Sequence, residues 1–150
     1  MPTEDSAEPI VLVVDIANVM GSRPDGWWRD RAGAATRLMT SLGALLGATI
    51  EGPDSGADAI RADAIGADAI RLTRIVAVIE GRARTAVAPA ELEVVAAPAD
   101  GDTTIVAVAQ QVSAQGGTVL VVTADRGLRA RLPAGTRIAG PRWLLDRLPA

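Results

Sequence analysis

Five short runs of apolar, mostly β-branched residues recur along the chain, each bounded by turn-forming residues. The runs are continuous and lack the apolar–polar alternation of a half-exposed sheet, so each predicts a strand that is covered on both faces. They are 10–14 (IVLVV), 74–79 (RIVAVI), 92–96 (LEVVA), 118–123 (TVLVVT) and 136–140 (TRIAG). Strands of this kind belong in a parallel sheet between two layers of helices.

Helical spacing of apolar residues separates the strand runs. Apolar side chains recur at i, i+3, i+4 and i+7 between 35 and 46 and again between 105 and 112, and a shorter pattern covers 126–132. Pro141 predicts the start of a last helix that runs through Leu148. With 150 residues the chain suits one α/β domain. We expect a Rossmann-like three-layer sandwich with right-handed crossovers and a central parallel sheet of about five strands.

Two segments do not follow this pattern. Residues 1–9 are polar and acidic and predict a disordered tail, which leaves 10–150 as the single domain. Between about 51 and 71, Ala-Asp-Ala-Ile occurs three times at a spacing of five residues, which keeps a common face in neither a helix nor a strand. This repeat predicts a loop insertion. No apolar stretch approaches the ~18 residues of a membrane span, and no secretory signal pattern opens the sequence, so we expect a cytoplasmic protein.

The composition excludes several chemistries. The chain has neither cysteine nor histidine, which removes disulfides, thiolate nucleophiles, Ser-His-Asp triads and His-ligated zinc. All 15 basic residues are Arg. Without Lys, the chain is a poor match for P-loop proteins, receiver domains and haloacid-dehalogenase-type phosphatases, which use a Lys at their sites. Carboxylates and other oxygen ligands remain.

Acidic residues stand where several of the predicted strands end. Asp15 ends the first run, Asp125 follows the fourth, and Asp100 and Asp102 open the second helical pattern. Parallel topology would bring them to the same edge of the sheet, where their charges would repel unless a divalent cation offset them. Mg²⁺ and Mn²⁺ prefer such oxygen ligands. Taken alone, Asp102 and Asp125 also suit helix N-caps, whereas no obvious helix follows Asp15.

Three short motifs, in this order, resemble the NYN domain of the PIN-like nuclease superfamily. They are D-I-A-N at Asp15–Asn18, GD-x-x-I at Gly101–Ile105 and T-A-D-R-x-L-R at Thr123–Arg129. The resemblance covers most of 10–148 apart from the insertion. It implies a PIN-like sheet and hydrolysis of RNA phosphodiester bonds. It also implies that Asp15, Asp102 and Asp125 bind Mg²⁺ or Mn²⁺ and that Asn18 holds the nucleophilic water or a substrate phosphate.

The sequence departs from the NYN pattern at two places. Thr103 stands where relatives often have a second acid after the one that matches Asp102. Many PIN-like nucleases also supply an acid from the helical segment between the early strands, and Glu80 is the nearest substitute here. We therefore add Glu80, Asp100, Thr103 and Thr123 to the candidate site as accessory residues.

Arginine and tryptophan side chains supply the candidate contacts to RNA. Arg82, Arg84, Arg126 and Arg129 can bind phosphates, and Trp27, of the Trp27-Trp28 pair, can stack on an unpaired base. The alternatives are solvation for the arginines and core packing for either tryptophan.

The expected partner is RNA, either single-stranded or structured. The sequence leaves open whether the chain forms a homo-oligomer. Two other functions also stay open. One is a metal-dependent phosphatase or nucleotide pyrophosphohydrolase that acts on small phosphorylated substrates. The other is a non-catalytic module that binds nucleic acid or protein.

Overall fold

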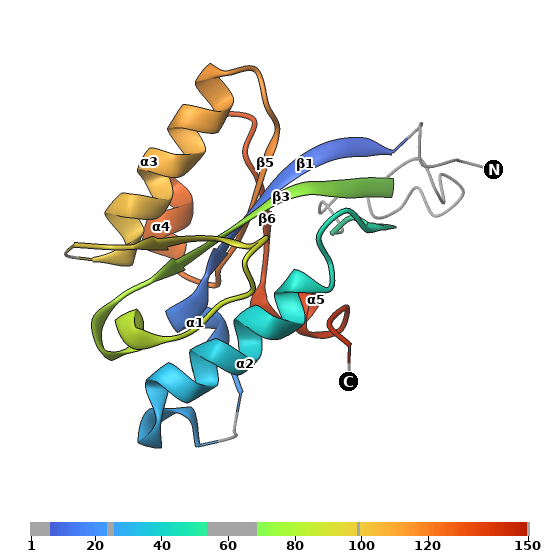
Figure 1. Ribbon diagram of the computed structural model, residues 1–150. Coiled ribbons are helices and arrows are strands. Elements are labelled where there is room, and N and C mark those ends of the chain that lie inside the picture. The colour runs from blue at the N-terminus through green and yellow to red at the C-terminus, as the bar shows by residue number, and fades with distance from the viewer. Residues whose placement is uncertain (1–6, 24–25, 54–68, 99, 150) are drawn as a thin grey trace.

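A sheet with five parallel strands forms the centre of the computed structural model, which describes residues 7–23, 26–53, 69–98 and 100–149 (Figure 1). Its parallel strands lie in the order β4–β3–β1–β5–β6. A sixth, short strand, β2, pairs antiparallel with the start of β3. The bounds are β1 Glu8–Asp15, β2 Thr49–Glu51, β3 Ala69–Ile79, β4 Glu93–Ala96, β5 Val119–Val122 and β6 Arg137–Ala139.

All five predicted strands are present, and the predicted α/β sandwich is confirmed. The edges differ from the prediction. β1 already begins at Glu8, inside the segment expected to be a tail, and β3 begins at Ala69, inside the expected insertion. β2 was not predicted, because three residues are too few to show a periodicity. The Ala-Asp-Ala-Ile repeat falls largely on 54–68, outside the described residues.

Helices cover both faces of the sheet. The α-helices are α1 Ile16–Gly21, α2 Arg31–Gly43, α3 Gly101–Ala114, α4 Arg126–Arg131 and α5 Pro141–Leu145, and short 3₁₀ turns are η2 Trp27–Arg29 and η5 Gly81–Thr85. Four of the α-helices match the sequence patterns. α5 ends at Leu145, short of the predicted Leu148, which still packs against the core. Among the described residues no helix is long and apolar enough to cross a membrane.

One expectation was wrong: a helix, α1, does begin directly after Asp15. Asp15 is its N-cap, and the carboxylate accepts a hydrogen bond from the backbone N–H of Asn18. With six residues, α1 is too short to show helical spacing of apolar side chains.

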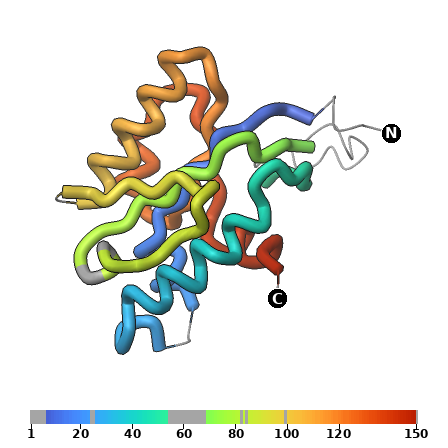
Figure 2. The backbone as a smooth tube through the Cα atoms, viewed as in Figure 1, coloured from blue at the N-terminus to red at the C-terminus, as the bar shows by residue number. Residues whose placement is uncertain are grey.

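Successive residues of β1 point into two separate cores. Leu12 and Val14 pack with side chains of α1, α2 and α5, whereas Val11 and Val13 pack with side chains of α3 and α4. The two groups of helices lie on opposite sides of the sheet (Figures 1 and 2). This double coverage explains why the run at 10–14 is apolar throughout instead of alternating.

A substitution at Leu12 tests how much the larger core contributes to stability. The Leu12 side chain is fully buried in the central strand, so we expect Leu12→Ala to lower the free energy of unfolding by about 2–5 kcal/mol. Val87 is 70% exposed, and Val87→Ala should change the free energy of unfolding by less than about 0.5 kcal/mol. Urea denaturation of both variants measures the difference. Equal midpoints would contradict the burial of Leu12.

Candidate functional site

Asp15 links the two central strands at their carboxyl ends. Its side chain is 8% exposed. Oδ1 accepts the N–H of Asn18 at 3.3 Å, and Oδ2 accepts the hydroxyl of Thr123 at 3.1 Å. Thr123 directly follows β5 and is fully buried. The carboxylate therefore joins the end of β1 to the end of β5, at the point where the chain order of the sheet reverses, which is where open α/β sheets bind ligands.

Further hydrogen bonds fix the turn that follows β5. Asn18 Oδ1 accepts the N–H of Ala124 at 2.8 Å, and Thr123 Oγ1 accepts the N–H of Asp125 at 3.1 Å. Arg129 donates to the Thr123 carbonyl from Nε at 3.2 Å and from Nη2 at 2.8 Å. Asn18 and Thr123 are thus both held at the site, and the Asn18 amide NH₂ is the group that could donate to a phosphate oxygen.

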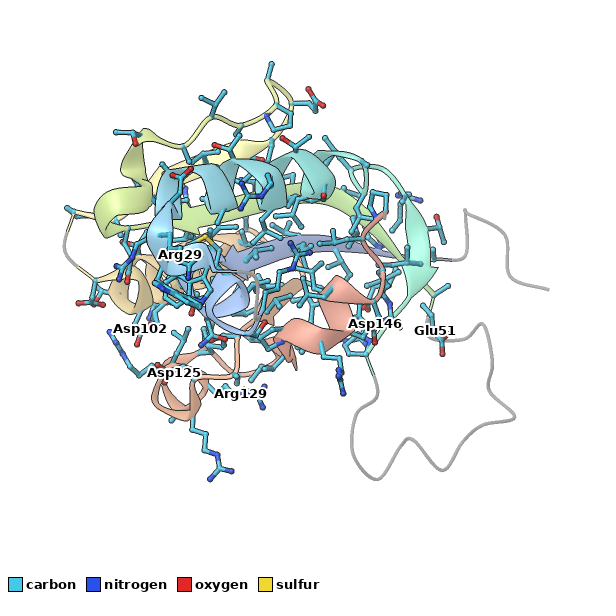
Figure 3. The ribbon with its side chains drawn as sticks, turned by 90° about the horizontal axis from the view of Figure 1, so that it is seen from below. Arg29, Glu51, Asp102, Asp125, Arg129 and Asp146 are labelled. Atoms are coloured by element: carbon cyan, nitrogen blue, oxygen red, sulfur yellow. The ribbon has the colours of Figure 1, made fainter. Side chains whose placement is uncertain are left out.

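Asp125 has one of the two roles that the sequence allowed, that of a helix N-cap. It caps α4, because Oδ1 accepts the N–H of Leu128 at 3.0 Å. Its charge also raises the pKa of Asp102. Figure 3 shows Asp102 and Asp125 toward one end of the molecule, whereas Asp146 and Glu51 lie toward the other. An N-cap and a ligand are therefore compatible roles at this position.

Asp102 interacts electrostatically with every other acid of the site. Partial burial is the largest cause of its raised pKa, followed by repulsion from Asp125 and Asp100 and, more weakly, from Glu80. Arg131 opposes the shift. The charge of Asp102 in turn raises the pKa of Asp15. We define the carboxylate site as Asp15, Glu80, Asp102 and Asp125.

Burial raises the pKa of Asp15 from 3.8 to about 6. The hydrogen bonds from Asn18 and Thr123 lower it, and the charges of Asp102 and Glu80 raise it further. Burial and like charge thus outweigh two hydrogen bonds. A carboxyl group in this state is typical of a functional site.

Asp100 and not Asp102 caps α3, so the N-cap interpretation of Asp102 was wrong. Asp100 Oδ1 accepts the N–H of Thr103 at 2.8 Å, and this bond is the main cause of its lowered pKa. Asp102 lies in the first turn of the helix. Thr103 Oγ1 also accepts a hydrogen bond from Arg131 Nη2 at 3.3 Å. Asp100 and Thr103 therefore form the hydrogen bond that caps α3. Asp102 is not the cap and interacts with the other acids of the site.

Glu80 reaches the site from the end of β3. Its carboxylate accepts a hydrogen bond from the N–H of Gly101. A Cβ atom on Gly101 would lie 2.5 Å from Glu80 Oε2, so any larger residue would displace the acid. Gly101, the first residue of the GD motif, thus permits the close approach of Glu80 to the start of α3.

The carboxylates of the site are the type of ligand that a divalent cation prefers. In the part of the chain that the structure describes, no three acidic side chains form a group that could hold a metal ion at their present positions. Mg²⁺ does not require such a group, because proteins often bind it through one or two carboxylates together with waters and substrate phosphates.

The residues predicted to contact RNA do not all lie at the carboxylate site. Arg126 and Arg129 are exposed on α4, next to Asp125. The side chains of Arg82 and Arg84 lie outside the described part of the chain. Trp27 packs against the core, whereas Trp28 is 55% exposed.

The sequence analysis missed Arg131 as a member of the site. This residue contacts Thr103 and lowers the pKa of Asp102. The sequence could have indicated Arg131, because the helical pattern at 126–132 that contains Arg126 and Arg129 also contains Arg131.

The strand order and the helices on both faces of the sheet give the chain a PIN-like fold. Among solved structures it is similar to that of Rae1 (YacP) from Bacillus subtilis, determined as a W164L mutant. The TM-score is 0.63 at 18% sequence identity, over 91% of this chain and 72% of that one. No protein-family model and no curated protein matches the chain. At this identity, the likeness establishes the fold.

Asp15→Asn should stabilise the metal-free protein at neutral pH. Because the pKa of Asp15 is raised from 3.8 to about 6, the folded state binds this proton more tightly than the unfolded chain. Its contribution to stability is present below about pH 4 and is lost as the pH rises through about 6. Asn keeps the shape and can cap α1 without the charge, and we expect a gain of up to about 3 kcal/mol at pH 8.

Urea denaturation in EDTA between pH 4 and 8 measures this difference, which should shrink as the pH falls. Asp146→Asn, at an exposed position at the other end of the molecule, is the control. An Asp15→Asn variant that is less stable than wild type at pH 8 would show that Asp15 is chiefly a structural cap.

Proposed function

We propose that this protein is a metal-dependent ribonuclease that hydrolyses RNA phosphodiester bonds at the carboxylate site. The observation that carries the proposal is the buried Asp15, with its pKa of about 6, facing the charges of Asp102 and Glu80. A fold tolerates such a destabilising group where the group has a function. The motifs that resemble the NYN domain, together with the PIN-like fold, support RNA as the substrate.

Asp102, with Asp15 or Asp125, would hold Mg²⁺ or Mn²⁺. When bound, such an ion supplies positive charge to a phosphoryl oxygen and activates water for attack. The negative charge that makes the carboxylate site unfavourable when empty would favour the cation. Because the chain has no Cys or His, this chemistry also avoids a covalent protein intermediate of those types.

The chain's own residues would orient the substrate around the ion. Thr123 and the backbone of Asn18 fix the Asp15 carboxylate by hydrogen bonds, so that it need not reorganise during the reaction. The Asn18 amide NH₂ would donate to a water or to a phosphate oxygen. Arg126 and Arg131, exposed on α4, would bind phosphates that flank the scissile bond.

Cleavage of a labelled single-stranded RNA tests the proposal. Wild-type protein should cut the RNA with Mn²⁺ or Mg²⁺ and not in EDTA. Asp102→Asn should lower the rate on the order of 10²-fold or more, because it removes the charge that interacts with all the other acids of the site. Asp146→Asn removes an exposed acid at the other end of the molecule and should cut as wild type does (Figure 3).

Other outcomes separate the remaining functions. Turnover of nucleotides without cleavage of RNA would replace the ribonuclease with an enzyme for small phosphorylated substrates. Absence of both activities, without a thermal shift on addition of Mn²⁺, would leave a non-catalytic binding module.

A second test concerns phosphate contacts. Arg126→Gln should weaken binding of single-stranded RNA in EDTA and reduce the slope of log Kd against log salt by about 0.7, the value for one phosphate contact. Arg37→Gln, on the exposed part of α2, is the matched control and should leave the slope unchanged. Equal slopes for Arg126→Gln and wild type would exclude Arg126 from the phosphate contacts.

A further inference from the structure

The turn between α1 and α2 presents an exposed tryptophan. Among the described residues, the large apolar side chains with high exposure are Trp28, Val87 and Val94, and only Trp28 is aromatic. Sequence analysis favoured Trp27 for contact with a base. The structure places Trp27 against the core and leaves Trp28 with 55% of its surface exposed.

Contacts with both of its neighbours in the sequence hold Trp28 in this position. The Trp27 and Trp28 rings meet edge to face, with centroids 6.1 Å apart and an interplanar angle of 88°. The Arg29 guanidinium lies 5.9 Å from the centroid of the Trp28 ring. The turn itself is closed by a hydrogen bond from the N–H of Arg29 to the carbonyl of Gly26 at 3.0 Å. An aromatic ring held in this way loses little conformational freedom when it binds a ligand.

The position of the turn is fixed relative to the carboxylate site. α1 starts directly after Asp15 and has six residues, so its far end lies about 9 Å along the helix axis from its start. Trp27 lies at the end of this helix, where its ring is 3.8 Å from the position of a Cβ on Gly21. Figure 3 shows Arg29 at the same end of the molecule as Asp102 and Asp125.

We propose that Trp28 and Arg29 form a nucleotide-binding subsite next to the carboxylate site, in which Trp28 stacks on an unpaired base and Arg29 binds the adjoining phosphate. This inference rests on the proposed function and specifies its substrate as RNA that is single-stranded at this subsite. A base within a duplex is already stacked on its neighbours and cannot offer a face to Trp28.

Charge supports a nucleic acid as the occupant. The four acids of the carboxylate site repel a polyanion, so a bound strand needs attractive contacts beside them. Arg29 and Arg31 supply positive charge at the turn, and the Arg31 guanidinium lies 5.4 Å from the centroid of the Trp27 ring. Aromatic rings combined with arginines are the usual means of binding single strands without sequence preference.

Fluorescence anisotropy with a short labelled single-stranded RNA in EDTA tests the subsite without cleavage. Trp28→Ala should raise Kd about 5- to 150-fold, the range for loss of one stacked base, and Trp28→Phe should raise it less. Val87→Ala truncates an apolar side chain elsewhere that is even more exposed, at 70%, and should leave Kd unchanged. A duplex of the same sequence should bind Trp28→Ala and wild type equally well. Circular dichroism checks that both Trp28 variants fold.

The outcomes distinguish this inference from the proposed function. If wild type cleaves RNA and Trp28→Ala binds and cleaves it equally well, the subsite is wrong and the ribonuclease stands. If no RNA is cleaved but binding depends on Trp28, the subsite stands and the ribonuclease is wrong. Failure of wild type to bind single-stranded RNA overturns the subsite. The subsite is also overturned if Trp28→Ala changes the oligomeric state but not Kd. That result would show that the Trp28 ring contacts another protein chain.

Discussion

The hydrogen bond between Thr123 and the buried carboxylate of Asp15 is the interaction around which the site is arranged. It joins the ends of β1 and β5, the neighbouring strands at which the order of the sheet reverses. On one side of the bond Asp15 starts α1, and on the other Thr123 fixes the backbone of Asp125, which starts α4. One polar contact thus sets the positions of two helices and of two acids of the site.

Electrostatic repulsion at this edge is offset only in part. Arg131 lowers the pKa of Asp102, and hydrogen bonds lower that of Asp15, yet both values stay above those of free aspartate. The raised pKa of Asp15 indicates that its charged form is unfavourable in the fold. The same excess of negative charge gives the site its affinity for a cation, so the features that weaken the empty fold are those that the proposed chemistry uses.

Much of this arrangement was readable in the sequence. The continuous apolar runs predicted the parallel strands, and the strand ends predicted that Asp15, Asp102 and Asp125 would lie at the same edge of the sheet. Helix α1 was missed because six residues show no periodicity, and with it the cap at Asp15 was missed. For α3 the sequence could not distinguish Asp100 from Asp102 as the cap, because both precede the same apolar pattern and the choice depends on where the first backbone N–H groups point.

By itself, therefore, the sequence determined the strands, the layers and the common edge of the acids, because these follow from periodicity and from the direction of parallel strands. Tertiary structure decided which of Trp27 and Trp28 packs against the core, how strongly the pKa of Asp15 is raised, and that Glu80 approaches Gly101 closely. These properties depend on distances between residues far apart in the chain. Trp27 and Trp28 are neighbours of the same type, and only the path of the turn between α1 and α2 turns one ring to the core and the other to solvent.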